Sequence, residues 1–457
     1  MYTSDRMIRR KYTIDELSRK LHVSQRTLLR EIQRGNLQTQ RVGRRHLISE
    51  EELNKYLGKN SLDLDKKIKN FLADKKDEMV FLLQKMVSMY SGSNELWEEG
   101  RLAAFIKSFL EKNGIRSVLY KDEQTVAVRG SFGFADEGIL LDCPLDTAPV
   151  GDLTKWLYPP FEGRIKEGKM YGRGTADCKA GIVSMIYTTL ALKEFVNEEK
   201  IRIELIFDGA EQSGEYSGMK LAIEKGLPVE AGIIGYSGNM NELPIGARGF
   251  HRYKFTTHGE SVHTGARYKL GVNAISKMVK FISEAEKAKL PRNKTAEYFP
   301  FGQRLTFSII EGGRVINVVP DECTAKVDIR TTPEVTKDKI DKFLAEIIRK
   351  IQKEDKDFKI DCKYDVGQEG FLINFKSKIV SSLNYSIKEV LKKEVPLTAS
   401  GPANIGKLLY NNNIPVVIWG PKGEGVHSYN EYIEIDSLPI TSEIYTRAIL
   451  NYFKLNE

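Results

Sequence analysis

The chain has 457 residues, and no run of about 18 apolar residues occurs in it, so we expect two to four folded domains and no membrane span. Four dispersed cysteines without CxxC spacing, and no signal-like start, favour a cytoplasmic protein with reduced thiols. Most of the net charge of +8 lies in residues 1–60, which carry 14 Lys or Arg against seven Asp or Glu. A module this basic is typical of binding to a polyanion, with a solubilising basic tail as the alternative.

The first part of the basic segment predicts two short helices. Thr13 and Glu16 form a capping box at the start of the first helix, and Ser24 caps a second helix that ends at Gly35. Three apolar residues of the second helix are expected to face inward: Leu28, Leu29 and Ile32. Its outward side chains are polar and basic: Gln25, Arg26, Arg30 and Arg34.

A hairpin over residues 41–48 follows, with Arg44 and Arg45 at its tip, and Ser49 caps a last short helix that is expected to reach Leu57. This order of elements resembles the excisionase-like, winged branch of helix-turn-helix domains. In such domains the second helix enters the major groove, and the wing touches the DNA backbone or the minor groove. The resemblance implies that double-stranded DNA contacts the polar face of the second helix and both wing arginines. A helical module that docks a protein is the alternative.

Beyond this module, the pattern predicts an α/β protein. Residues 61–76 are polar and are expected to be a linker. Apolar runs that alternate with helical patterns then indicate a mostly parallel sheet. Between residues 248 and 366 the order becomes strand-helix-strand-strand-helix-strand, which is the split-βαβ arrangement. We therefore expect a helix-turn-helix domain over 1–60, an α/β domain formed by 77–247 and 367–457, and an inserted domain over 248–366.

Two acids follow strand ends in the α/β part, where open sheets collect ligands. Asp146 lies after the buried run Gly138–Cys143, and Asp177 lies in a Gly-rich turn before an apolar helix. This layout resembles the zinc-dependent family of aminoacylases, acetylornithine deacetylase-like enzymes and carboxypeptidases. In that family a strand ends in His-x-Asp, and a later Gly-Arg-Gly-x-x-Asp supplies the acid that bridges two metals. The resemblance spans residues 77–457 and implies that the inserted domain is a lid through which the protein forms a homodimer.

The chain departs from that family at three metal-ligand positions. Pro144 stands where the family has its first His, and Gln212 and Tyr236 stand at positions of acids. Residues that match the family are Asp146 and the general base Glu211 at catalytic positions, and Asp177 and His427 among the metal ligands. Two metals need about five or six such ligands, so we expect a site without catalytic metal, and zinc only if the site functions after all. The neighbouring acids Asp142 and Asp208 are the candidates to compensate.

The ligand-binding side of the family is better matched. The matching residues are His263, which resembles a lid His that reaches the partner subunit's site, together with Asn317, Arg330, Ser400 and Gly401. Because a guanidinium group can hold a carboxylate in bidentate geometry, an amino acid, acyl-amino acid or short peptide is the expected ligand.

The leading hypothesis from the sequence is a DNA-binding transcriptional regulator whose hydrolase-like body senses such a ligand and dimerises. The first alternative is a metal-dependent amide hydrolase, a peptidase or deacylase, fused to a DNA-binding domain. A second alternative is a scaffold that only dimerises the DNA-binding module.

Overall fold

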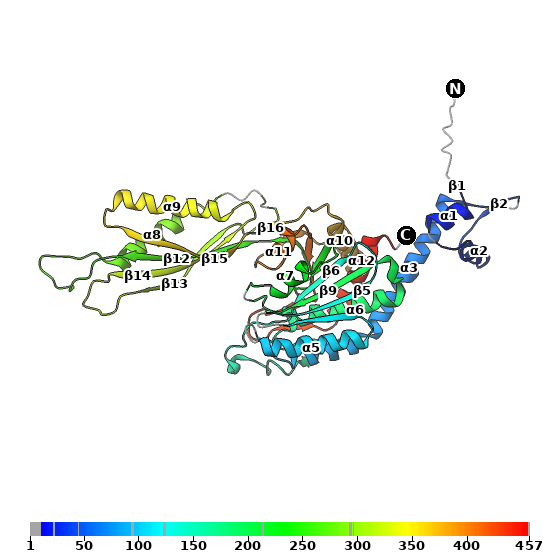
Figure 1. Cartoon of the computed structure of the whole chain (residues 1–457), viewed down its shortest axis with the longest axis horizontal. Helices are drawn as coiled ribbons and strands as arrows, with labels where there is room; N and C mark the ends of the chain where they lie inside the picture. Colours follow the sequence, from blue (N-terminus) through cyan, green and yellow to red (C-terminus); the bar gives the residue numbers. More distant parts are fainter. Residues whose placement is uncertain are drawn as a thin grey trace, which may run out of the picture.

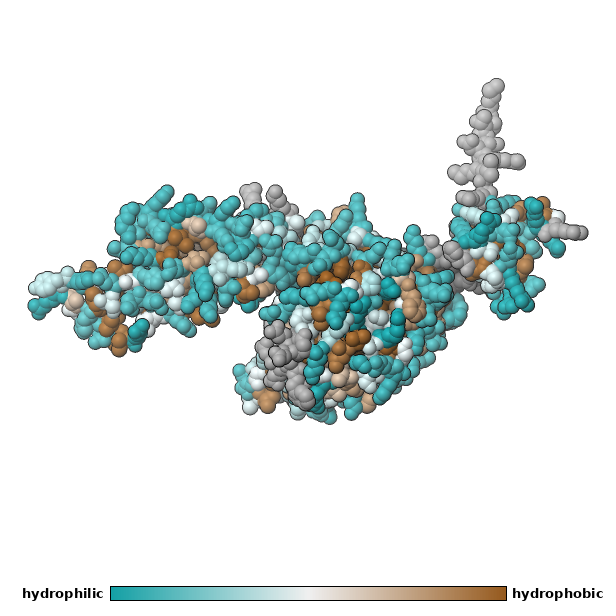
Figure 2. Space-filling model, in the orientation of Figure 1, coloured by the Kyte–Doolittle hydropathy of each residue, from teal (hydrophilic) through white to brown (hydrophobic). Residues whose placement is uncertain are grey.

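The computed structural model of the chain describes residues 11–21, 23–43, 45–92, 96–121, 125–212, 214–291, 295 and 297–455. A small helical module, an α/β body and a second sheet domain follow one another along the long axis (Figure 1). Each of the three parts has its own cluster of buried hydrophobic residues. The visible surface is mostly hydrophilic, with hydrophobic residues in separate patches (Figure 2). Within the described ranges, no helix combines the length and the apolar character that crossing a bilayer requires.

The N-terminal module is a three-stranded sheet with two short helices. Its elements are β1 (Lys11–Thr13), α1 (Ile14–Lys20), α2 (Gln25–Gln33), β2 (Gln40–Val42) and β3 (Arg45–Ser49). The capping box of Thr13 and Glu16 is present, and Ser24 Oγ accepts a hydrogen bond from the Thr27 amide at 3.1 Å. Leu28 is fully buried, whereas Leu29 is 40% exposed, so the prediction that Leu29 faces inward is wrong. Consecutive helical residues point about 100° apart, and the small core accommodates only one of them.

The helix that Ser49 caps does not stop at Leu57. It continues as α3 (Glu50–Asp74), so residues expected to form a linker are helical as far as Asp74. Leu53 belongs to the core of the N-terminal module, and Ile68 and Leu72 belong to the core of the body. Burial at both ends favours an unbroken helix over the polar sequence between them. One helix is therefore shared by two hydrophobic cores, and Figure 1 shows it running from the module along the body.

The body is a twisted sheet of six strands with helices around it, and its mostly parallel character confirms the prediction. The strand order is β18 (Val416–Ile418), β10 (Ala231–Ile234), β6 (Ile139–Pro144), β9 (Arg202–Asp208), β5 (Val126–Gly133) and β4 (Arg116–Lys121). The first four strands are parallel to one another, and β5 runs antiparallel to both of its neighbours, β9 and β4. The helices are α4 (Lys76–Val87), α5 (Leu96–Lys112), α6 (Ala180–Phe195), α7 (Ser217–Glu224), α10 (Lys378–Leu391), α11 (Gly406–Asn411) and α12 (Ser437–Phe453).

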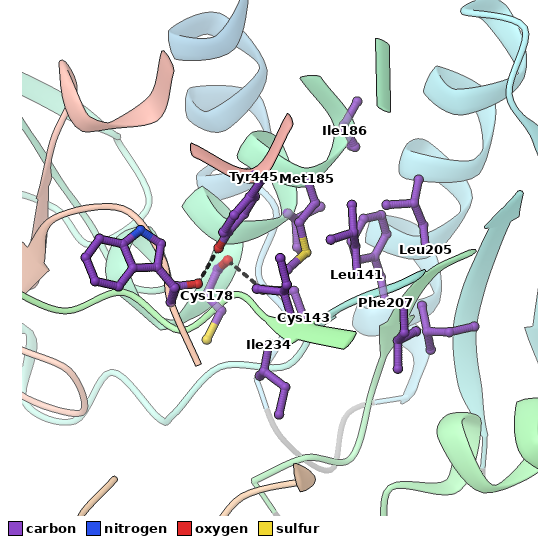
Figure 3. Close-up of a cluster of buried hydrophobic side chains, with 14 of the residues drawn as sticks. Leu141, Cys143, Cys178, Met185, Ile186, Leu205, Phe207, Ile234 and Tyr445 are labelled. Carbon is purple, nitrogen blue, oxygen red and sulfur yellow. Dashed lines mark hydrogen bonds between the residues drawn. The ribbon is translucent and has the colours of Figure 1, made fainter. Parts of the chain in front are cut away.

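Two hydrogen bonds in the centre of the body core link strand β6 and helix α12 to neighbouring loops. The Cys143 thiol on β6 donates to the carbonyl oxygen of Cys178 at 3.2 Å, and the Tyr445 hydroxyl on α12 donates to the carbonyl oxygen of Trp419 (Figure 3). Helix α12 also holds α3, since Arg447 lies 2.6 Å from Asp65. Two small sheets, which the sequence did not predict because their strands have only two to five residues, complete the body. They are β16 (Phe371–Leu372), β11 (Leu243–Ala247) and β17 (Leu397–Ser400), and β19 (Gly423–Glu424), β20 (Tyr432–Glu434), β8 (Lys169–Tyr171) and β7 (Arg164–Lys166).

The inserted domain has the expected strand-helix-strand-strand-helix-strand order. Its elements are β12 (Gly249–His258), α8 (Ala274–Lys287), β13 (Arg304–Gly312), β14 (Glu322–Thr331), α9 (Lys337–Glu354) and β15 (Lys359–Gln368), with strand order β13-β14-β12-β15. Burial alternates along β12, so Tyr253 and Phe255 pack against the two helices while Arg252 and Lys254 point to the other, open face. One face of this sheet is therefore core, and the other is polar and basic.

Candidate functional site

Asp146 lies just beyond the end of β6, and it holds a loop of the body. Its two carboxylate oxygens accept hydrogen bonds from the amides of Glu211 and Gln212, at 3.1 and 3.0 Å. The side chain is fully buried, which raises its pKa to about 6 against the lowering effect of these two hydrogen bonds. Asp146 thus fixes the backbone that carries Glu211 and Gln212.

Asp177 is positioned by a buried acid that the sequence did not single out. The carboxylate of Glu431 accepts from the amide nitrogens of Ala176 and Asp177, at 2.8 and 2.9 Å, and pairs with Arg173 at 2.7 Å. These contacts hold the turn Thr175–Lys179, whose backbone is not helical at Asp177 and Cys178 and in which the Asp177–Cys178 peptide bond is cis. Arg173 was the available signal, because an Arg in a buried Gly-rich turn requires a carboxylate partner.

The side chains at the metal-ligand and catalytic positions contact one another. His427 Nε2 lies 2.8 Å from Asp177 Oδ2, and this hydrogen bond raises the pKa of the imidazole. The Tyr236 hydroxyl donates to one oxygen of Glu211 at 2.7 Å, and the Gln212 amide donates to the other at 3.2 Å. The five residues form one network, which we call the body wall: Asp177, Glu211, Gln212, Tyr236 and His427.

The carboxyl group of Glu211 holds its proton more tightly than an ordinary glutamic acid. Burial is the largest cause, and the nearby negative charge of Asp177 adds to it, so its pKa rises to about 8. The hydrogen bond from Tyr236 opposes this shift without cancelling it. At neutral pH the Glu211 carboxyl group is therefore protonated in a large fraction of the molecules. A carboxyl group with such a pKa can exchange a proton near neutral pH.

The residues present do not fit a two-metal centre. Among the residues that the structure describes, no group of three or more His, Cys, Asp or Glu side chains is arranged to hold a metal ion. Neither compensating acid serves: Asp142 is buried in β6 with no hydrogen-bond partner, and Asp208 accepts the amides of Gly218 and Met219. Burial raises the pKa of both acids well above the ordinary range, which opposes the ionised form that a metal ligand needs.

The body wall faces a cleft of about 960 Å³ whose other side is formed by the inserted domain and its junction with the body. Three predicted ligand-binding residues line it: Arg330, Ser400 and Gly401. Arg248 and Arg252 line it too, and sequence reasoning missed them. The available signal was the alternation Arg-Gly-Phe-His-Arg, which places Arg248, Phe250 and Arg252 on one side of a strand.

His263 and Asn317 are exposed, lie outside this cleft and lie close together. The Thr264 amide donates to the carbonyl oxygen of Asn317 at 3.0 Å, and His263 pairs with Val318. The role of His263 in a partner subunit's site and the role of Asn317 as a ligand-holding residue stay predictions.

The helix-turn-helix module presents the expected basic face. Gln25, Arg26, Arg30 and Arg34 on or next to α2, and Arg45 on β3, are exposed. Gln25 donates to Asp15, and Arg34 pairs with Glu31 at 3.3 Å, which leaves Arg26 and Arg30 as the less engaged cations of α2. Arg44, predicted at the tip of the wing, falls outside the described residues.

Comparison with known proteins identifies both parts of the chain. Residues 140–451 match peptidase family M20/M25/M40, and residues 12–61 match a helix-turn-helix domain family. Since the first match covers well over half of the chain, the protein belongs to peptidase family M20/M25/M40.

Individual relatives are distant but nearly full-length. The chain is 25% identical over 407 residues to a probable succinyl-diaminopimelate desuccinylase of Staphylococcus aureus, which covers 82% of this chain and 98% of the relative. Among solved structures, it resembles the aminopeptidase PepT of Bacillus cereus (TM-score 0.69, 21% identity, covering 83% of this chain and 99% of the other). It also resembles the YXEP protein of Bacillus subtilis, described as a dinuclear metal-binding peptidase (TM-score 0.62, 14% identity, 83% and 98%).

Proposed function

We propose that this protein is a DNA-binding transcriptional regulator whose peptidase-like body binds a small carboxylate ligand instead of hydrolysing a substrate. The observation that supports this best is the direct contact between Asp177 and His427, at 2.8 Å, beside three positions where metal ligands are missing. Asp177 is buried and its carboxylate already has this exposed imidazole as a partner, so its charge is partly compensated within the protein. The helix-turn-helix domain supplies the DNA-binding half of the proposal.

The body can influence the module through contacts that begin at the cleft. Trp419 lines the cleft, and its carbonyl oxygen accepts from Tyr445 on α12. Two residues further along α12, Arg447 pairs with Asp65 on α3, the helix whose N-terminal end lies in the core of the module. A ligand that favours one arrangement of α12 would thereby change the position of the module, typically with a coupling of about 1–3 kcal/mol.

The DNA-binding part is tested by selecting bound sequences from genomic fragments with the full chain and measuring affinity against salt. We expect the logarithm of affinity to fall with slope about −0.9 per phosphate contacted. Arg26→Ala should weaken binding about tenfold and relax specificity, whereas Arg349→Ala, an exposed position on α9, should change nothing. Enrichment of no sequence, or affinity independent of salt, would favour the protein-docking alternative.

Dimerisation through the inserted domain belongs to the same proposal. A two-fold dimer would present two modules to a two-fold operator. Light scattering measures whether the full chain is a dimer. The same measurement on a chain lacking residues 248–366 shows whether the dimer depends on the inserted domain.

The second candidate is a metal-dependent amide hydrolase. It is favoured by the retained Asp146, Asp177, Glu211 and His427, and by relatives whose names are those of peptidases and desuccinylases. Elemental analysis after dialysis separates the two proposals, since close to two zinc ions per chain would support the hydrolase.

A further inference from the structure

The cleft wall formed by the inserted domain concentrates guanidinium groups around one aromatic ring. Phe250 on β12 lies directly opposite Arg330 on β14, and Arg252 lies two residues further along β12. The guanidinium carbons of Arg252 and Arg330 lie 4.9 and 5.6 Å from the centre of the Phe250 ring. On β13, Arg304 lies opposite Arg330. Stacking on a common ring restricts these long side chains before any ligand arrives.

The positive charge of this wall is only partly balanced. Arg252 and Arg330 share a single carboxylate, that of Asp328, at 3.1 and 2.7 Å. Within the described part of the chain, neither Arg248 nor Arg304 forms an ion pair. The four guanidinium groups, of which those of Arg248, Arg252 and Arg330 line the cleft, are therefore balanced by a single ion-paired carboxylate among the described residues.

Arg248 is the most constrained of the four. It is half-buried at the junction between β11 and β12, and its Nε donates to the carbonyl oxygen of Gly401 at 3.1 Å. Burial, and then the charges of Arg330 and Arg304, lower the pKa of this guanidinium. A charge that is both desolvated and repelled by its neighbours is stabilised when an anion enters beside it.

We propose that this wall is a second anion position, formed by Arg248 and Arg252 beside Arg330, so that the ligand of the cleft carries at least two negative charges. The inference rests on the proposed ligand-binding function and narrows its chemical class. A carboxylate held by Arg330 alone would not neutralise the remaining positive charge of the wall. A dicarboxylate and a phosphate monoester share the required charge, and the guanidinium fork suits both.

The test is calorimetric titration of the full chain at constant ionic strength with matched probes. Succinate and glutarate represent dicarboxylates, inorganic phosphate represents phosphates, and acetate and butyrate are the singly charged controls. We expect a dianion to bind at least about tenfold more tightly than the monoanions, because each added charged hydrogen bond contributes about one such factor. Arg248→Gln and Arg252→Gln should each reduce dianion affinity about tenfold and leave monoanion affinity within about twofold. Arg349→Gln, on the helical side of the same domain, is the matched control.

Equal affinity for dianions and monoanions, no binding of any dianion, or unchanged affinity in the Arg248→Gln Arg252→Gln double variant would each overturn the inference. A preference for succinate or glutarate over phosphate identifies the dicarboxylate source, and the reverse identifies phosphate. These results distinguish failure of the inference from failure of the proposed function. If a monoanion binds through Arg330 alone and shifts DNA affinity, the sensor function is supported and the second anion position is not. A dianion that binds but leaves DNA affinity unchanged keeps the anion position without the sensor.

Discussion

The two walls of the cleft differ in how their polar groups are satisfied. On the body side, Asp177, Glu211 and their neighbours are hydrogen-bonded to one another, although the family places metal ligands there. On the inserted-domain side, two of the four guanidinium groups, those of Arg252 and Arg330, share the carboxylate of Asp328. A network that is complete within the protein gains little from a ligand, whereas an excess of like charge gains much from a counter-ion. The function proposed above therefore assigns ligand recognition to the inserted-domain wall and not to the body wall.

The largest change should come from rebuilding the metal ligands of the body wall. The variant Pro144→His Gln212→Glu Tyr236→Asp should bind zinc at least about 100-fold more tightly than the native chain, because ligands matter at least as much as the groups that orient them. Competition against a chelating dye measures this. Adding His427→Ala to the triple variant should remove the gain, while circular dichroism checks that both variants are folded. A native chain that already retains two zinc ions would abolish the contrast between the walls.

A smaller effect should distinguish the two walls in ligand binding. For a compound found by thermal shift among amino acids, acyl-amino acids and dipeptides, Arg330→Ala should weaken binding about tenfold, since a charged hydrogen bond contributes about 1.5–3 kcal/mol. Glu211→Ala should change the affinity by less than about threefold, because no chemical step is required. Calorimetry of both variants is the measurement. The reverse order of effects would show that the body wall carries the recognition.

The smallest effect concerns stability and its dependence on pH. The pKa of Glu211 is raised to about 8 in the folded protein, from an ordinary value of 4.5. The stability that follows from this shift is present below about pH 4.5 and is lost as pH rises towards 8, because only the unfolded chain releases the proton freely over that range.

Glu211→Gln, which does not titrate, should therefore gain stability relative to the native chain between pH 5 and pH 8.5. The full shift would amount to roughly 4 kcal/mol, and because the side chain is only half-buried, solvent screening should reduce the gain to about 1 kcal/mol. Urea unfolding at the two pH values measures the difference, with the exposed Glu346→Gln on α9 as control. An equal difference at both pH values would show that Glu211 is ordinarily solvated.

Much of the fold could be predicted because its signals are local. The caps at Thr13 and Ser24, the apolar run of β6 and the alternation of β12 each reflect residues within a few positions of one another. The extent of α3 could not be predicted, because its C-terminal half is stabilised by a core formed mainly by residues far along the chain.

The same distinction applies to the site. Pro144, Gln212 and Tyr236 could be recognised as departures one at a time. Their consequence, that the remaining side chains bond to each other, depends on contacts such as that between Asp177 and His427, 250 positions apart. The alternation that places Arg248 beside Phe250 is visible in the sequence, but its hydrogen bond to the carbonyl oxygen of Gly401, 153 residues away, is not.

Because α3 is one unbroken helix, the number of residues in it sets the direction in which the N-terminal module points. Each residue added to or removed from a helix turns everything beyond it by about 100° and shifts it by about 1.5 Å. Two extra residues near the middle of α3 would aim α2 at nearly the opposite side of the molecule, whereas three or four would almost restore its heading. The length of α3 can therefore change with little effect on the direction of the module only by about one whole helical turn at a time. Related chains that combine such a module with such a body should tolerate insertions there only in steps that close a turn.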